Sequence, residues 1–142
     1  MLDNLPNLTE MIFTYTFITP WEMLKICLAH PSITSITYSY AYVFAIYDPP
    51  SGEDMARTPI PLLGFTYLAP AWREQWAQRR QVYRLIDQFM REAKWLAALV
   101  PNMASTVEHL NLPLETAPLQ PMAELSWPNL RTLIIRGRYI RE

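Results

Sequence analysis

Glycine, cysteine and net charge are all scarce in this 142-residue sequence, and each scarcity excludes a class of function. Only three glycines are present, and none forms part of a glycine-rich loop that could cradle a phosphate group. The single cysteine, Cys27, excludes an internal disulfide and suggests a reducing compartment, the cytoplasm or the nucleus. A formal net charge of −1 provides no overall attraction for nucleic acid or for an anionic membrane.

Long apolar runs and catalytic motifs are missing as well. The longest uninterrupted apolar run extends from Tyr40 to Tyr47, whereas a membrane-spanning helix needs about 20 residues. The first residues have neither the basic nor the apolar region of a signal peptide. His30 and His109 have no spacing that relates them to Cys27, which we expect to be a buried thiol. We therefore predict no enzymatic activity, no bound metal or cofactor, and no membrane association.

The sequence does contain an apolar triplet that recurs at positions i, i+3 and i+5. The copies are, in chain order, Leu8, Met11 and Phe13; Ile33, Ile36 and Tyr38; Leu62, Phe65 and Tyr67; Val107, Leu110 and Leu112; and Leu130, Leu133 and Ile135. Because alternate residues of a strand share one face, each triplet predicts a strand whose last two members point into a core. Most intervals between copies fall within or at the edge of the window of about 20–29 residues found in leucine-rich repeats.

The segments between the triplets predict helices and loops. Thr19 as a cap, with Pro20 at the first helical position, predicts a helix that ends before Pro31. The proline-rich segment Asp48–Pro61 predicts an exposed, mobile connection. Over residues 38–47, large apolar and aromatic side chains alternate with smaller residues, which predicts a longer strand or a second extended segment.

The third interval is nearly doubled, and it contains the segment Trp72–Val100, which lacks both proline and glycine. This segment predicts a long inserted helix, either continuous or divided in two. Its expected buried stripe comprises Val82, Tyr83, Ile86, Phe89, Met90, Ala93, Leu96, Ala97 and Val100. The later segment Gln120–Ser126 has room for at most two helical turns before the last strand.

The stretches PNLTEMIFTYTFITPWEMLKICLAHPSITSITYSY and WPNLRTLIIRG resemble the leucine-rich-repeat region of fungal F-box-like proteins. The resemblance is clearest over residues 5–47 and 103–138. It implies an α/β, right-handed solenoid with about five short parallel strands, helices on the convex side and one long inserted helix. In that family an F-box docks on an adaptor of a cullin ubiquitin ligase, and the repeats present the substrate.

Two features of the sequence depart from that family. No F-box-like helical stretch precedes the first triplet, so adaptor binding is not expected from this chain alone. Residues 1–142 are expected to be a single irregular domain, a fragment of a longer solenoid with unpaired strand edges that invite association. The asparagine or cysteine that commonly follows each strand is also absent, and its positions hold Thr16, Ala41, Pro70, Glu115 and Arg138. The usual asparagine ladder therefore cannot form.

The residues beside the triplets are expected to form a concave surface that binds a protein partner. The predicted partner-binding residues are Glu10, Ile12, Thr14, Ser35, Thr37, Ser39, Thr66, His109, Asn111, Thr132, Ile134 and Arg136. For any one of them the alternative is simpler, because small polar and β-branched residues suit a solvated strand face. By resemblance, the chain is predicted to be the substrate-recognition region of an F-box-type ubiquitin-ligase receptor.

An alternative partner is a nucleic acid or an acidic protein that binds the basic face of the helix over residues 72–100. That face comprises Arg73, Arg79, Arg80, Arg84, Arg91 and Lys94, with tryptophans at 72 and 76 nearby. Glu74, Asp87 and Glu92 are interspersed, and acids at helical spacing more often form a solvated, ion-paired face. The sequence therefore favours a protein partner over nucleic acid.

Overall fold

The computed structural model of the chain describes residues 4–14, 20–39, 48–50, 54–55, 58–68 and 82–137. The strands in this part are β1 (Glu10–Thr14), β2 (Ser35–Ser39), β3 (Gly64–Leu68), β4 (His109–Pro113) and β5 (Thr132–Arg136). The helices with described bounds are α1 (Pro20–Leu28), α5 (Val82–Leu99) and α6 (Leu119–Glu124). A short 3₁₀ helix, η2 (Val100–Met103), directly follows α5.

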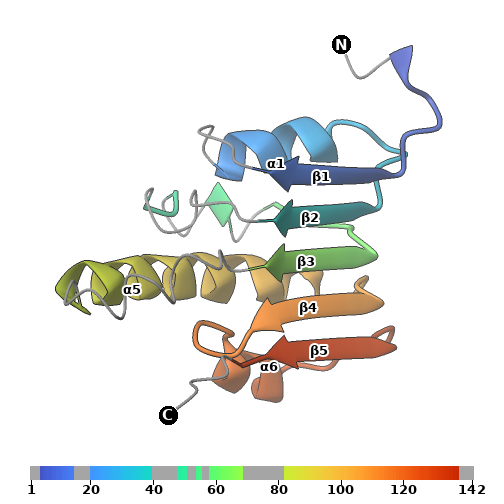
Figure 1. Ribbon diagram of the computed structural model, residues 1–142. Coiled ribbons are helices and arrows are strands. Elements are labelled where there is room, and N and C mark those ends of the chain that lie inside the picture. Colours follow the sequence, from blue (N-terminus) through green and yellow to red (C-terminus); the bar gives the residue numbers. More distant parts are fainter. Residues whose placement is uncertain are drawn as a thin grey trace.

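The five strands are all parallel and lie side by side in chain order, with β1 and β5 at the two edges (Figure 1). Each strand begins two residues after the first member of an apolar triplet. The pairing has no shift, so the second triplet members form one row across the sheet: Met11, Ile36, Phe65, Leu110 and Leu133. The five predicted strands and their parallel sheet are therefore confirmed.

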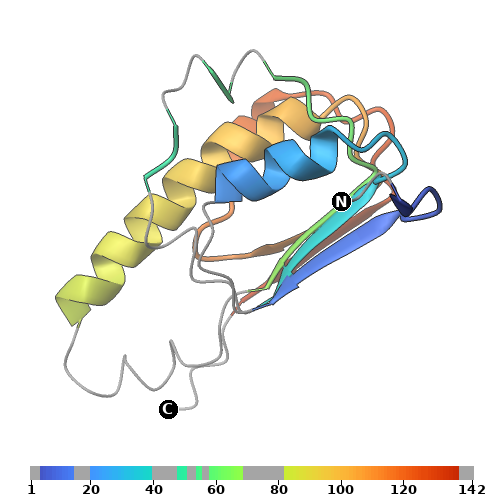
Figure 2. The ribbon, with the colours of Figure 1, turned by 90° about the horizontal axis from the view of Figure 1, so that it is seen from above.

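The helices α1, α5 and α6 lie on one face of this sheet (Figure 2). Strand residues turned toward them, such as Tyr38 and Phe65, are buried in one core with Trp95 and Leu96 of α5. The rings of Phe13, Tyr38 and Phe65 form a row across β1, β2 and β3, with centroids 5.4 and 6.0 Å apart. Burial of such side chains stabilises the fold by about 25 cal/mol per Å² of apolar surface. The α/β class and the long helix are confirmed.

The helix α1 begins at Pro20 and ends at Leu28, as the capping and proline signals predict. Its buried face comprises Met23, Leu24 and Cys27, which join the core behind the first two strands. The helix α6 has six residues, within the two turns expected for that segment. The expected extended stretch over residues 40–47 and the expected helical residues 72–81 lie outside the described residues.

The helix α5 confirms the long inserted helix over residues 82–99. Of the expected buried stripe, Leu96 and Val100 are buried as predicted, but the buried face as a whole is turned relative to that stripe. Ile86 and Met90 were expected in the core, yet their side chains are 47% and 56% exposed. The buried face of α5 instead includes Glu92, Trp95 and Leu99. The stripe is rotated by about one residue, roughly 100° at 3.6 residues per turn. The first half of α5 extends beyond the sheet (Figure 2). The apolar residues in that half therefore do not indicate which face of the helix packs against the core.

The segment 48–61 is not simply an exposed connection, which corrects the expectation from its prolines. Met55 and Ile60 are each 1% exposed and belong to the core. The Asn102 side-chain amide donates a hydrogen bond of 2.7 Å to the carbonyl of Met55. This segment therefore covers part of the core behind the sheet, and two apolar residues among the prolines are sufficient to anchor it.

Each strand after β1 begins with the same pair of backbone hydrogen bonds to the strand before it. The carbonyl of Thr9 accepts from the N–H groups of Thr34 and Ser35, at 2.9 and 3.1 Å. The same arrangement recurs at the next three junctions, at 2.8–3.1 Å. The Thr34 carbonyl accepts from the N–H groups of Leu63 and Gly64, and the Leu63 carbonyl accepts from those of Glu108 and His109. The Glu108 carbonyl accepts from the N–H groups of Arg131 and Thr132. We call these four pairs the strand-start ladder. They join all five strands by one repeated device.

A polar side chain three residues before a strand reinforces the ladder. The Ser32 hydroxyl donates to the Leu8 carbonyl at 2.7 Å, and the Asn129 amide donates to the Ser105 carbonyl at 2.7 Å. Thr106 occupies the same position before β4, and its hydroxyl donates to the carbonyl of Ile60 or Leu62, at 3.2 and 3.1 Å. These side chains link successive strands at their beginnings.

Candidate interaction surface

We call the face of the sheet that is turned away from the helices the outer face. The five strands carry all twelve predicted partner-binding residues on this face, because these residues alternate with the core-facing ones. The zero-shift pairing aligns the middle residue of each strand in one row: Ile12, Thr37, Thr66, Asn111 and Ile134. The structure therefore brings the twelve residues together on one continuous surface.

The middle row of the outer face is apolar at its ends and polar at its centre. Ile12 on β1 is 60% exposed and Ile134 on β5 is 40% exposed, while Thr37, Thr66 and Asn111 between them are half-buried. Two isoleucine side chains thus flank a central strip of hydroxyl and amide groups. Such a strip can donate and accept hydrogen bonds, and its isoleucine flanks can bury apolar side chains.

Asn111 has the most distinctive chemistry of the outer face. Its side-chain Oδ1 is buried and accepts no hydrogen bond from the part of the chain that the structure describes. A buried polar atom without a partner costs about 1–3 kcal/mol of stability. Because the atom is already out of contact with solvent, a partner's donor could reach it only if the side-chain amide turned outward. The sequence predicted its position on the face but not its missing partner.

Gly64 marks a close approach between β2 and β3 at the start of the outer face. A Cβ atom at this position would lie 2.7 Å from the Ser35 hydroxyl oxygen, which is too close for any real contact. Gly64 and Ser35 are paired in the register, so the serine side chain leans over the glycine. A larger residue here would require the Ser35 hydroxyl to rotate away, and glycine leaves room for it in its present position.

Charges on the outer face are few and well separated. Glu10 on β1, His109 on β4 and Arg136 on β5 are its exposed titratable residues, and no ion pair joins them within the described residues. Glu10 and Arg136 lie on opposite edge strands. Recognition on this face would therefore depend on shape and hydrogen bonding more than on long-range electrostatics.

A buried polar cluster lies on the other side of the sheet, and the sequence did not predict it. Glu92 of α5 is fully buried, and its carboxylate accepts hydrogen bonds from the Tyr67 hydroxyl at 2.5 Å and the Thr116 hydroxyl at 2.7 Å. Glu92 was expected among the solvated acids of the basic face, so that expectation is wrong. The available signal was Tyr67, because a tyrosine at a core-facing position needs a partner for its hydroxyl.

The titratable groups of the core behave as structural groups. Burial raises the pKa of the Cys27 thiol from 9.0 to about 11, so the thiol is protonated at neutral pH. Burial, and in second place the charge of the nearby Cys27, also raise the pKa of Tyr38. A buried, protonated thiol is a poor nucleophile. The described residues contain no group of three or more histidine, cysteine, aspartate or glutamate side chains placed to hold a metal ion.

The basic face of the long helix is only partly described. Arg91 Nε lies 3.6 Å from Asp48 Oδ1, so this arginine is engaged in an ion pair. Lys94 is exposed on α5, whereas Arg73, Arg79 and Arg80 lie outside the described residues. Nucleic-acid or acidic-partner binding by this face stays a prediction. No helix among the described residues is both long and apolar enough to cross a membrane.

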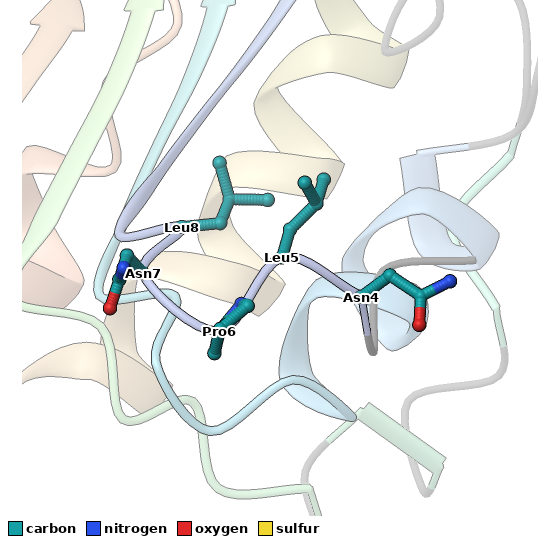
Figure 3. A pocket seen from close by; sticks show the side chains of 5 residues that line it. All are labelled: Asn4, Leu5, Pro6, Asn7 and Leu8. Atoms are coloured by element: carbon teal, nitrogen blue, oxygen red, sulfur yellow. The ribbon is translucent and has the colours of Figure 1, made fainter.

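A small hollow opens beside the start of β1 (Figure 3). Its lining is one continuous stretch of chain, residues 4–8, in which Leu5 and Leu8 provide apolar side chains and Asn4 and Asn7 provide amides. The described residues that line the hollow include no titratable side chain.

Comparisons with known proteins do not assign this chain to a family. Neither the protein-family models, nor the curated proteins, nor the solved structures gave a significant match to this chain. The resemblance to fungal F-box-like proteins therefore stays a prediction that depends on the sequence motifs alone.

Proposed function

We propose that this chain is a protein-interaction module whose outer face binds a protein partner. The observation that carries the proposal is the middle row, in which two exposed isoleucines flank the half-buried polar side chains of Thr37, Thr66 and Asn111. Exposed isoleucine side chains gain free energy when a partner covers them, and the half-buried threonine hydroxyls between them can donate and accept hydrogen bonds. The action of the chain is then to position a partner.

The size of the outer face favours a short segment of the partner over a whole folded domain. Five strands spaced about 4.8 Å apart, each five residues long at about 3.3 Å per residue, form a face of roughly 300 Å². A stable interface between folded proteins buries about 800 Å² on each partner. An extended or helical segment that crosses the strands from Ile12 to Ile134 would match this smaller area.

The finer proposals follow the family resemblance. We propose that the strands and helices form a right-handed solenoid of the leucine-rich-repeat type, which the chain-ordered strands and the strand-start ladder support. We further propose that the bound protein is a substrate of an F-box-type ubiquitin ligase. The adaptor of that ligase is not expected to bind this chain. Recovery of a partner without the adaptor would support this assignment.

The test is affinity capture from a fungal cell extract, with the partner identified by mass spectrometry. Wild-type chain is compared with Thr37→Lys and Thr66→Glu, which place a charge at the centre of the outer face. We expect at least a tenfold loss of the captured partner with either variant, because an ammonium or carboxylate group there would lose hydration on binding. Thermal unfolding of each variant checks that the fold is retained.

The matched control is Lys94→Glu, which also changes a charge but lies on the exposed side of α5. We expect this variant to capture the partner as well as the wild type does. The opposite pattern, with capture lost in Lys94→Glu and retained in Thr37→Lys, would reject the outer face in favour of the basic helix. Capture that also fell steeply with salt would then indicate nucleic acid.

A further inference from the structure

At one edge of the sheet the donor groups of the strand-start ladder are exposed, and at the other edge its acceptor group is exposed. At every internal junction a carbonyl of one strand accepts from two consecutive N–H groups of the next. At the β1 edge, the N–H groups of Thr9 and Glu10 occupy the donor positions, and at the β5 edge the carbonyl of Arg131 occupies the acceptor position. None of these groups has a ladder partner within the described residues.

The apolar rows are incomplete at the same edges. The second triplet members of the three inner strands, Ile36, Phe65 and Leu110, are at most 1% exposed. Leu133, the equivalent residue of β5, is 47% exposed, and Met11 of β1 is only partly buried. Each edge therefore has core-facing apolar surface that a further parallel strand would cover.

We propose that the β5 edge of one copy of this chain pairs, parallel and head to tail, with the β1 edge of a second copy. Continuing the zero-shift register places Thr132 opposite Glu10, Leu133 opposite Met11, and Ile134 opposite Ile12 of the second copy. The Arg131 carbonyl then accepts from the Thr9 and Glu10 N–H groups, as in the four internal junctions. This contact is separate from the central strands of the outer face.

The side chains at the two edges support this partner. Leu133 and Met11 would cover each other in the core-facing row, and the exposed isoleucines Ile134 and Ile12 would become cross-strand neighbours on the outer face. No like charges meet, because Glu10 faces Thr132 in the continued register. Asn7 completes the pattern. It lies three residues before β1, the position from which Ser32, Thr106 and Asn129 donate to the preceding strand.

The symmetry of the contact determines the kind of assembly. The two edges are different surfaces, so the contact is heterologous and leaves a free edge at each end of a pair. Further copies add at those edges until a ring closes or an open filament forms. The assembly should therefore grow beyond dimers as the concentration rises.

A disulfide test reports the register directly. Tagged Glu10→Cys chain is mixed with untagged Thr132→Cys chain under oxidised glutathione. Neighbouring strands are about 4.8 Å apart, within the range of about 4.4–6.8 Å between Cα atoms that a disulfide spans. We expect a disulfide between the tagged and untagged chains in the mixture, and none in either variant alone. The native Cys27 is buried and should not compete.

Cross-linking of Glu10→Cys with itself would indicate a symmetric edge contact and would overturn the head-to-tail proposal, as would the absence of any disulfide in the mixture. Sedimentation of the wild-type chain over a range of concentrations provides the second measurement. Leu133→Lys should shift the chain to monomers, whereas Ile86→Lys, an equally exposed site far along α5, should not. A wild-type chain that stays monomeric throughout would also reject the proposal.

Discussion

At the scale of single residues, Glu92 is the group whose burial in the core costs the most free energy unless hydrogen bonds compensate. Its carboxylate is fully buried, and the hydroxyls of Tyr67 and Thr116 donate to its two oxygens. Burial of a carboxylate costs several kcal/mol unless hydrogen bonds compensate. These bonds connect α5 to β3 and to the turn after β4, so Glu92 fixes the position of the long helix relative to the sheet.

We predict that Glu92→Ala lowers the free energy of unfolding by about 3 kcal/mol, because it leaves two buried hydroxyls without an acceptor. Glu92→Gln should lower it by less than half as much, since the amide oxygen still accepts one hydrogen bond. Chemical denaturation of both variants at neutral pH measures the difference. Equal losses in the two variants would show that the hydrogen bonds contribute little.

The raised pKa of the Cys27 thiol leads us to predict that the stability of the chain falls as the pH rises above about 9. The pKa of the thiol is raised in the folded chain, from 9.0 to about 11, so the unfolded chain loses the proton first as the pH rises. The contribution of the protonated thiol is therefore complete below about pH 9 and is lost between about pH 9 and 11. Relative to Cys27→Ala, the wild type should lose up to about 2 kcal/mol of stability over that interval.

Denaturation of both chains from pH 8 to pH 11 checks this expectation. Other groups titrate in the same interval, Tyr38 among them, but they are present in both chains. The difference between wild type and Cys27→Ala isolates the thiol. A difference that stays constant up to pH 11 would mean that the thiol ionises as easily in the folded chain as in the unfolded chain.

At the scale of elements, the strand-start ladder is the main feature that the sequence analysis did not anticipate. The sequence has no asparagine after each strand, and it did not indicate that inter-strand links would lie before the strands instead. A signal was present in the sequence. Proline followed by a small polar residue precedes three of the five strands, at Pro6–Asn7, Pro31–Ser32 and Pro128–Asn129.

We predict that Asn129→Ala lowers the free energy of unfolding by about 1 kcal/mol, the usual net contribution of one such hydrogen bond. Asn7→Ala is a matched control, because Asn7 occupies the same position before β1, which is an edge strand of the described sheet. At concentrations where the chain is monomeric, Asn7→Ala should leave the stability unchanged. Thermal or chemical denaturation at low concentration measures both, and equal effects would argue against the ladder.

The face of α5 could not be deduced from periodicity, because the helix carries two apolar stripes. Ile86 and Met90 begin one stripe, and Trp95 and Leu99 belong to the other. Only the sheet decides which stripe is covered, and it covers the second half of the helix (Figure 2). The buried Glu92 made the correct stripe look more polar than the wrong one.

At the scale of the whole molecule, the sheet and its outer face were predictable, and the reason is physical. A slip of one residue would turn every core-facing side chain outward, so the apolar triplets fix both the register and the outer face. What the triplets do not encode is the environment of each outer residue. The half-buried centre, the exposed isoleucines and the unpartnered Asn111 Oδ1 depend on neighbouring strands that are distant in sequence.

Two surfaces of the molecule therefore have separate proposed roles. The outer face, from Ile12 on β1 to Ile134 on β5, is proposed to bind a partner segment, and the backbone edges of β1 and β5 are proposed to join copies of the chain. Thr37 and Leu133 lie on these two surfaces respectively, so substitutions at the two positions should separate the two activities. A self-associating chain would also present several outer faces at once, which strengthens binding to repeated partner segments.

The central claim is that five short segments of the sequence are five neighbouring strands joined by the strand-start ladder. Amide hydrogen exchange measured by NMR on the monomeric chain tests it most directly. The N–H groups of Ser35, Gly64, His109 and Thr132 should all exchange slowly, because each donates to the preceding strand. Glu10, with no preceding strand, should exchange quickly. Rapid exchange at any one of these four N–H groups would show that its strand is not hydrogen-bonded to the preceding strand, which would contradict the account.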